Sequence, residues 1–244
     1  MKKKRPSSKS LSLIEKTWRF NDKVADNFDV HVNQSIPHYN DLQKYLVQLS
    51  EWFLKDGTVV YDLGCSTGET IEKILKLDVS TKYKIVGIDN SQRMLDLAKE
   101  KIAKVENRNV EVIFENIDLT KDLQFEKSNL FYSILLFPFI NYENRRKIIR
   151  GIYESLETGG ALITVEKVRS SNSDFEDILN QLYFDFKLEQ TLTEKDILAK
   201  AKSLRSSMYL FDEKTIFDDL EDAGFKKHEV FFKCFNFLGY IAIK

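Results

Sequence analysis

The residues best suited to chemistry lie at the ends of two apolar runs in the first half of the chain. Asp62, Gly64, Ser66 and Gly68 occupy alternate positions at the end of one run, and Asp89 ends the next. Glycine adopts backbone angles that a side chain would forbid, so Gly64 lets the chain turn sharply and lets a ligand approach the main chain. A carboxylate roughly 20 residues beyond such a turn can accept both hydroxyls of a ribose. The pattern therefore predicts a site for a nucleoside-containing molecule.

The order of residues in the turn favours one kind of cofactor. A dinucleotide site requires Gly-x-Gly-x-x-Gly, whereas this turn reads Asp-x-Gly-x-Ser-x-Gly, with Ser66 at the position of the middle glycine. The acid Asp62 suits an amino group better than a pyrophosphate. S-adenosylmethionine carries an ammonium, a ribose and an adenine but no phosphate, so we predict S-adenosylmethionine rather than NAD. The alternative is a plain strand-to-helix turn in another α/β domain, which the spacing to Asp89 disfavours.

Further residues near the predicted strand ends are candidates for cofactor contacts. Asn90 can reach the ribose or the adenine edge, or it can instead cap the following helix, for which Ser91 is the more conventional cap. Asn116 and Ile117 follow the third predicted strand, where an amide can pair with adenine and an apolar side chain can pack against its face. Cys65 lies between Gly64 and Ser66, where its small side chain fits the tight turn.

Alternating strands and helices position these residues. Apolar runs predict strands at 59–63, 84–88, 110–114, 130–136 and 161–168. Amphipathic stretches between them predict helices at 69–77, 92–104 and 144–156. A glycine pair, Gly159 and Gly160, is expected to stop the last of these helices. Such alternation is typical of a doubly wound parallel sheet, so the predicted fold class is α/β.

The C-terminal third is expected to add helices and a hairpin. Three helical runs and two β-rich runs follow one another at 174–186, 194–206, 212–223, 229–234 and 237–243. Only Phe235 and Asn236 separate the two β-rich runs, which predicts an antiparallel hairpin at the sheet edge. The whole is then a mostly parallel, seven-stranded, Rossmann-like sheet.

The N-terminal segment is too aromatic for a disordered leader. We expect residues 12–54 to form a helical cap over the site together with residues 174–210. Residues 1–11 carry a basic cluster without a following apolar run, so they are expected to be a disordered tail rather than a signal or an anchor. Residues 12–244 then form a single S-adenosylmethionine-binding domain.

Composition excludes several classes of partner and environment. Lys and Arg number 37 against 38 Asp and Glu, so the net charge of -1 gives no overall basic field for a nucleic acid. Cys65 and Cys234 are too few for a disulfide framework and lack partners at metal-ligand spacing, which favours a reducing cytoplasm. The longest apolar stretch, 131–140, is far shorter than the ~20 residues that span a bilayer. We therefore expect a cytoplasmic protein without a metal that contacts neither nucleic acid nor membrane.

Matching stretches along nearly the whole chain reveal a resemblance to a known family. They are Trp18 to Phe20, Val24 and Ala25, Gln34 to Tyr39, Tyr61 to Ser66, Ile88 to Ser91, Gly159 to Leu162, Asp185 to Lys187, and Cys234 to Phe237. With these stretches the chain resembles class I S-adenosylmethionine-dependent methyltransferases and, within them, the carboxy-S-adenosyl-L-methionine synthases, formerly described as wobble-uridine tRNA methyltransferases. The stretches at 18–25, 34–39, 185–187 and 234–237 lie outside any generic cofactor motif, which supports the narrower resemblance.

The resemblance carries implications for contacts and reaction. The implied cofactor contacts are Tyr39, Gly64, Cys65, Ser66, Asp89, Asn90, Asn116 and Ile117. In those synthases prephenate loses carbon dioxide, which is captured on the activated methyl group of S-adenosylmethionine. The product supplies a carboxymethyl group for modification of a tRNA wobble uridine, although the synthase need not bind tRNA. The resembling enzymes are oligomers, so a homodimer is expected.

Three positions depart from the family pattern, one of them Asn116, where an aspartate is commoner in the family. The family has an asparagine in the fourth strand that contacts the cofactor, and Ile134 stands at that position here. The family also has an arginine that pairs with the added carboxylate. Lys202 aligns with that arginine, and Arg205 lies about one helical turn away. Lysine is a poorer bidentate partner than arginine. Lys202 and Arg205 are therefore the candidates for the reaction centre.

Three functions remain open from the sequence. The departures leave the groups for ordinary S-adenosylmethionine intact, so the first interpretation is a methyltransferase that acts on an unidentified small molecule. The alternative is a carboxy-S-adenosyl-L-methionine synthase that uses prephenate, and the second alternative is a non-catalytic cofactor-binding protein. No obligatory catalytic residue follows, because alignment of an acceptor with the sulfonium supplies much of the rate. If the acceptor must lose a proton, Glu166, Asp185 or a tyrosine is a candidate base.

Overall fold

The computed structural model describes residues 28–77, 80–106, 109–121, 124–205 and 207–244. The tail predicted at 1–11 and the first part of the predicted cap, 12–27, lie outside these ranges. No helix within the described ranges is both long enough and apolar enough to cross a bilayer.

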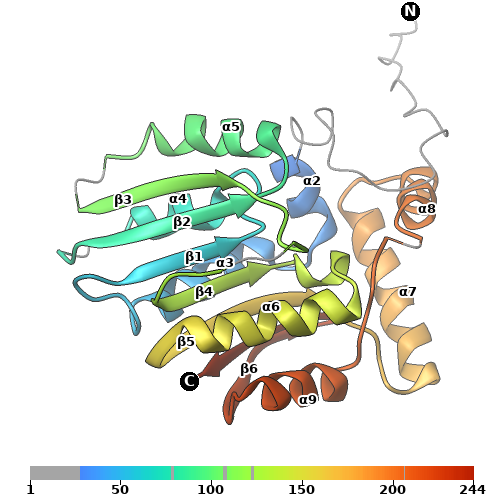
Figure 1. Ribbon diagram of the computed structural model, residues 1–244. Helices are drawn as coiled ribbons and strands as arrows, with labels where there is room; N and C mark the ends of the chain where they lie inside the picture. Colours follow the sequence, from blue (N-terminus) through green and yellow to red (C-terminus); the bar gives the residue numbers. More distant parts are fainter. Residues whose placement is uncertain (1–27, 78–79, 107–108, 122–123, 206) are drawn as a thin grey trace, which may run out of the picture.

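A seven-stranded sheet forms the centre of the molecule (Figure 1). In spatial order its strands are β3 Val110–Asn116, β2 Tyr83–Asp89, β1 Val59–Leu63, β4 Ser128–Ile134, β5 Leu156–Lys167, β7 Phe237–Ile243 and β6 Lys227–Cys234. The first five run parallel, whereas β7 runs antiparallel to β5 and β6. The predicted doubly wound, mostly parallel sheet with a C-terminal hairpin is confirmed. Of the two hairpin strands only β6 lies at a sheet edge, because β7 inserts between β5 and β6, and β3 forms the opposite edge.

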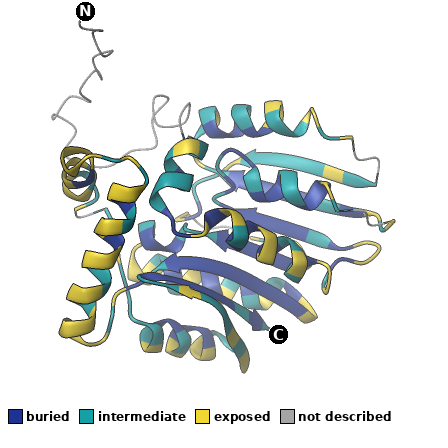
Figure 2. Cartoon of the chain, turned by 180° about the vertical axis from the view of Figure 1, so that it is seen from behind, coloured by how far each residue is buried: buried dark blue, intermediate teal, exposed yellow. Residues whose placement is uncertain are grey.

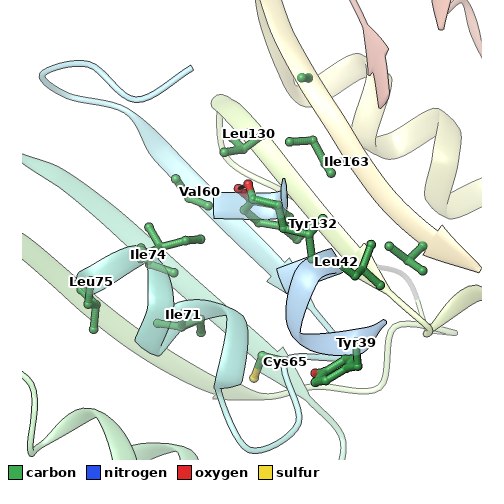
Figure 3. Close-up of a cluster of buried hydrophobic side chains, with 14 of the residues drawn as sticks. Tyr39, Leu42, Val60, Cys65, Ile71, Ile74, Leu75, Leu130, Tyr132 and Ile163 are labelled. Carbon is green, nitrogen blue, oxygen red and sulfur yellow. Dashed lines mark hydrogen bonds between the residues drawn. The ribbon is translucent and has the colours of Figure 1, made fainter. Parts of the chain in front are cut away.

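Helices cover both faces of this sheet. They are α2 Phe28–Ser35, α3 Tyr39–Ser50, α4 Glu69–Leu75, α5 Gln92–Ile102, the short η1 Phe137–Phe139, α6 Tyr142–Ser155, α7 Ser173–Glu189, α8 Glu194–Ser203 and α9 Glu213–Ala223. Alternation along each strand gives the sheet two cores. Val60 and Tyr132 point into the core under α3 and α4 (Figure 3), whereas Tyr61 and Phe131 point into the core under α6 and α9.

The glycine pair before the fifth strand has a different role from the one predicted. The strand β5 begins directly after α6, at Leu156, so Gly159 and Gly160 lie inside the strand instead of stopping the helix. Gly159 has a φ of +83°, and a Cβ on Gly160 would lie 2.8 Å from the carbonyl oxygen of Asn129. The pair thus lets β5 change direction and approach the start of β4, where the register of the two strands shifts.

Three helices, α2, α7 and α8, lie beyond the carboxyl ends of the parallel strands (Figure 1). At the start of α2, Asp29 accepts hydrogen bonds from Thr67 Oγ1 at 2.5 Å and from Lys101 Nζ at 2.7 Å. At its end, the carbonyl oxygen of Ser35 accepts a hydrogen bond from the Tyr183 hydroxyl of α7 at 2.9 Å. The helix α2 is therefore tied at both ends, whereas α3 packs on the sheet. The outer side of α7 is largely exposed (Figure 2).

A buried ion cluster lies on the α6 face of the sheet. Arg145 Nη1 is 2.5 Å from Glu166 Oε2, and Arg145 Nη2 is 2.9 Å from Glu166 Oε1. The Tyr240 hydroxyl also hydrogen-bonds Glu166, and Arg145 Nε lies 3.5 Å from Asp219 Oδ2. Buried charges are tolerated in a core when they are paired and hydrogen-bonded. Glu166, a candidate base from the sequence, is therefore a structural residue on this face.

Candidate functional site

A large cavity opens where β1, β2 and β4 end. Its volume is about 1020 Å³, enough for a nucleoside cofactor and a second small molecule. The strand ends and their turns form one side, the strand wall, and α2, α7, α8 and the end of β5 form the other, the helix wall. Open α/β sheets bind ligands at this edge, outside the carboxyl ends of the strands.

The turn after β1 has the backbone geometry that its glycines predict. Gly64 and Ser66 have positive φ values of 70° and 52°. The amides of Gly64 and Cys65 donate to the carbonyl oxygen of Ile88 at 2.8 and 2.9 Å, which fixes the turn to the end of β2. A Cβ on Gly64 would lie 3.0 Å from Leu136 Cδ1. The absent side chain therefore keeps the main chain accessible from the cavity.

Asp89 is held in place by the main chain on both sides. Its Oδ2 accepts a hydrogen bond from the Ser66 amide at 3.0 Å, and its Oδ1 accepts one from the Ser91 amide at 2.8 Å. Burial raises the pKa of Asp89, while these backbone hydrogen bonds act in the opposite direction. Each carboxylate oxygen keeps a further lone pair, so the group can accept the ribose hydroxyls as the spacing predicts.

Asp62 is a buried acid on the strand wall. The residue is 3% exposed, and no basic side chain in the described part of the chain forms an ion pair with it. Burial, with a contribution from the charge of Asp89, raises the pKa of Asp62 to about 7. A cation beside Asp62 would reverse this shift. The amino group of S-adenosylmethionine is such a cation, so the site fits the predicted cofactor.

Most other predicted cofactor residues also line the cavity. Tyr39, Cys65, Asn90, Ile117 and Ile134 all contribute to it. Burial raises the pKa of the Tyr39 phenol, so its hydroxyl stays protonated. Figure 3 shows Tyr39 and Cys65 at the same end of the core under α3 and α4.

Asn116 does not line the cavity. The residue is exposed, and its Nδ2 donates to Gln92 Oε1 in α5 at 3.0 Å. Neighbouring residues at the end of a strand point to opposite sides, so Ile117 faces the cavity while Asn116 faces α5. The structure therefore offers Ile117, but not Asn116, for contact with an adenine.

The helix wall carries cations that the sequence analysis did not single out. Lys167 at the end of β5, Lys187 in α7 and Lys200 in α8 line it, with His31 from α2. Burial and the charge of Lys167 lower the pKa of Lys187 to about 8. Burial and the charge of Lys187 lower the pKa of Lys200 to about 7. Burial and the charges of Lys200 and Lys187 lower the pKa of His31 to about 4. These mutual effects place the cations in one region, which favours an anionic ligand.

Two of these lysines lie against one aromatic ring. Lys187 Nζ is 3.9 Å and Lys167 Nζ is 4.6 Å from the centroid of Tyr183. Within the described ranges, neither ammonium has a carboxylate within 4 Å, although the charge of Glu176 partly opposes the lowering of the Lys167 pKa by burial. The ring offsets part of the cost of burying them, by about 0.5–2 kcal/mol for each contact.

The two candidates for the reaction centre differ in position. Arg205 lines the cavity, whereas Lys202 is exposed and does not. Two helical positions separate Lys202 from Lys200, about 200° around the axis, so only one of them can face the cavity. Asp185, a candidate base, is also exposed and bonds Gln181 within α7. The described residues contain no group of three or more His, Cys, Asp or Glu that could hold a metal ion.

Comparisons with known proteins match nearly the whole chain. The sequence profile of the ubiE/COQ5 methyltransferase family matches residues 15–243. The carboxy-S-adenosyl-L-methionine synthase of Staphylococcus epidermidis is 35% identical over 228 residues, which cover 93% of this chain and 97% of that protein. The enzyme of the same name from Methylococcus capsulatus is 34% identical over 226 residues, which cover 92% of this chain and 93% of that protein.

Solved structures share the fold at low sequence identity. Phosphoethanolamine N-methyltransferase 2 of Haemonchus contortus, in complex with S-adenosyl-L-methionine, has a TM-score of 0.63 at 14% identity, covering 92% of this chain and 57% of that one. An O-methyltransferase family protein from Burkholderia thailandensis also has a TM-score of 0.63 at 14% identity, covering 92% of this chain and 60% of that one. The chain therefore belongs to the ubiE/COQ5 methyltransferase family, with curated relatives named carboxy-S-adenosyl-L-methionine synthase, and is an S-adenosylmethionine-dependent transferase.

Proposed function

We propose that the protein is a carboxy-S-adenosyl-L-methionine synthase that uses S-adenosylmethionine and prephenate. The observation that carries this proposal is the opposite charge of the two walls of one cavity. The strand wall offers carboxylates to the ammonium and ribose of the cofactor, while the helix wall offers Lys167, Lys187 and Lys200. A donor of carbon dioxide must itself be a carboxylate, whereas a methyl acceptor need not be charged.

Each wall then has a defined task. Asp62 holds the amino group of the cofactor, and Asp89 holds the ribose hydroxyls. S-adenosylmethionine supplies an activated methyl carbon when bound. The lysines hold the donor by its carboxylates, which fixes its position relative to that carbon. Ile134 and Leu135, at the end of β4, line the cavity with apolar surface that limits the access of water.

The reaction balances without a further co-reactant. A carbon–carbon bond to one carboxylate of prephenate breaks, and a new carbon–carbon bond forms between that carbon and the methyl carbon. The methyl group loses one proton. The ring of the donor becomes aromatic as its hydroxyl leaves, so the proton and the hydroxide depart as water.

Methyl transfer to an anionic small molecule is the second candidate. Ile134 offers no hydrogen bond where the resembling synthases have an asparagine, and Lys202 lies outside the cavity. Both observations reduce the contacts available to a carboxylated cofactor. The lysines of the helix wall would then hold the acceptor instead of the donor.

Incubation with S-adenosylmethionine and prephenate tests the proposal. Mass spectrometry of the quenched mixture is expected to detect carboxy-S-adenosyl-L-methionine in an amount equal to the prephenate consumed. The small molecule released by denaturing freshly purified protein is measured in parallel and is expected to include the same compound. Unused prephenate, with only S-adenosylmethionine or its demethylated product released, would overturn the proposal and favour methyl transfer.

The proposal extends to the cellular role expected from the resemblance. The protein would act in the cytoplasm as a homodimer, and its product would supply a carboxymethyl group for a tRNA wobble uridine without direct contact between protein and tRNA. Deletion of the gene is expected to remove carboxymethylated wobble uridine from tRNA hydrolysates. Light scattering during size-exclusion chromatography measures the oligomeric state.

A further inference from the structure

We infer that Tyr183 is a positioning residue with two separable roles: its ring supports Lys167 and Lys187 for an anion, and its hydroxyl holds the end of α2 beside the cavity. The inference rests on the proposed function for the nature of that anion. Tyr183 lies in α7 and is 5% exposed, in contrast to Leu182 and Phe184 on either side of it, which are 44% and 38% exposed. Its burial therefore reflects contacts on the cavity side of the helix.

The ring of Tyr183 sets the positions of two ammonium groups. Lys187 Nζ and Lys167 Nζ lie 3.9 Å and 4.6 Å from its centroid, within the range of cation–π attraction. Phe237, which also lines the cavity, packs edge-on against the same ring with 5.4 Å between centroids. The ring is thus held by packing, so it acts as a fixed support for lysines that come from two different elements.

The hydroxyl of Tyr183 contacts a third element. It donates to the carbonyl oxygen of Ser35, the last residue of α2, at 2.9 Å. Burial raises the pKa of this phenol, so it remains a donor at neutral pH. The first turn of α2 is tied separately, through Asp29. Gln34 Nε2 also donates to the carbonyl oxygen of Gln190, at the end of α7, over a longer 3.4 Å. Loss of the Tyr183 hydroxyl therefore removes the shorter of these two hydrogen bonds to the last turn of α2 while leaving the ring against the lysines.

Two variants separate the roles of ring and hydroxyl. Tyr183→Phe keeps the ring, so malonate, a small dianionic probe, should bind as in the wild type when measured by isothermal titration calorimetry. Hydrogen exchange of the amides of 28–35, measured by mass spectrometry with S-adenosylmethionine bound, should be faster in this variant. Tyr183→Leu removes both groups, and its malonate affinity should fall about tenfold, the effect expected from losing two partly desolvated cation–π contacts.

Tyr153→Leu provides a matched control. Tyr153 also has a lysine over its ring, with Lys244 Nζ 4.8 Å from the centroid, but it does not line the cavity. This variant should lower thermal stability without changing malonate affinity. If Tyr183→Leu does not fold, Tyr183→Met replaces it.

The outcomes distinguish this inference from the proposed function. Wild-type protein that does not bind malonate, Tyr183→Leu that binds it with wild-type affinity, or Tyr183→Phe with unchanged exchange at 28–35 would overturn the role of Tyr183. Synthesis of carboxy-S-adenosyl-L-methionine would then still support the proposed function. Conversely, the expected malonate and exchange results without use of prephenate would support Tyr183 and overturn the synthase.

Discussion

The two walls of the cavity carry opposite charge and are built in different ways. The strand wall is made from turns, and its acids Asp62 and Asp89 are positioned by strand ends and backbone amides. The helix wall is made from long side chains, and its lysines come from β5, α7 and α8. The pKa values of Lys187 and Lys200 are lowered by burial and by repulsion between like charges, and no main-chain hydrogen bond contributes, whereas main-chain hydrogen bonds act on the pKa of Asp89.

The two walls therefore use different parts of the chain to bind their ligands: the main chain on one side and long side chains on the other. Under the proposed function, the strand wall holds the cofactor through main-chain geometry that the turn fixes. The helix wall holds the second substrate through side chains that single substitutions can change. The charge of each wall can therefore be altered separately, which the following variants exploit.

Removal of the buried acid should have the largest effect. In Asp62→Asn the affinity for S-adenosylmethionine should fall by about tenfold to hundredfold, the value of a hydrogen bond to a charged group. Malonate affinity should not change. Titration calorimetry measures the affinities for both ligands. Asp56→Asn is the control, because Asp56 is exposed and precedes β1, at the opposite end of the sheet from the cavity. Equal losses in the two variants would show that Asp62 has no specific role in binding the cofactor.

Removal of the most buried of the three lysines of the helix wall should weaken binding of the other ligand, prephenate. Lys187 is 8% exposed, and Lys187→Met keeps an unbranched stem while removing the charge. The KM for prephenate should rise about tenfold or more, because a charged contact is lost, while the KM for S-adenosylmethionine stays within about twofold. Steady-state kinetics checks this, with exposed Lys195→Met in α8 as control. A parallel rise in both KM values would contradict the separation of the walls.

Ligand affinity at the two walls should depend on pH in opposite directions. Asp62, with a pKa of about 7, loses its negative charge as pH falls through that value, so cofactor affinity should decrease on the acid side. Lys200 and Lys187, with pKa values of about 7 and 8, lose their positive charges as pH rises, so malonate affinity should decrease on the alkaline side. Calorimetric titrations at several pH values check both, and the acid decrease should be absent in Asp62→Asn.

The lowered pKa of Lys200 also predicts how the stability of the ligand-free protein depends on pH. The pKa of Lys200 in the folded chain, about 7, lies below its ordinary value of 10.5, so between these values the unfolded chain binds more protons. Stability should therefore rise with pH across this window. Thermal unfolding of Lys200→Met is expected to show a smaller rise than the wild type, and an identical rise would mean that Lys200 does not contribute.

Substitution of the two candidates for the reaction centre should give the smallest effects. Arg205 is exposed where it lines the cavity, so Arg205→Gln should lower kcat/KM for prephenate by only about twofold to fivefold, because solvent screens an exposed charge. Lys202→Gln should leave kcat/KM unchanged, since Lys202 lies outside the cavity. A larger loss in Lys202→Gln than in Arg205→Gln would reverse this order.

The strand wall could be predicted because its residues are neighbours in sequence. The spacing from Gly64 to Asp89 spans one strand, turn and helix, so local patterns were sufficient to find it. The helix wall joins Lys167, Lys187 and Lys200, which only the fold brings together. The family alignment identified Lys202 in α8, but alignment does not define which side of a helix faces the cavity.

Element types were likewise more predictable than their boundaries. The alternation of apolar runs gave the sheet and its C-terminal hairpin, because burial on both faces leaves a strong pattern. The glycine pair Gly159 and Gly160 was expected to end a helix, since local sequence alone does not distinguish a helix stop from a bend inside a strand. The contact of Gly160 with Asn129 of the neighbouring strand decides between them.

The strand β5 places Glu166 and Lys167 side by side in the chain and on opposite sides of the sheet. Glu166 is neutralised by Arg145, whereas Lys167 lies in the cavity. A substitution of Glu166 would leave the buried charge of Arg145 without its partner and affect folding, whereas a substitution of Lys167 would change the cavity. After gene duplication, one copy can change its substrate through Lys167 while the ion cluster next to it continues to hold the strand in place, so a new specificity need not begin with a loss of stability.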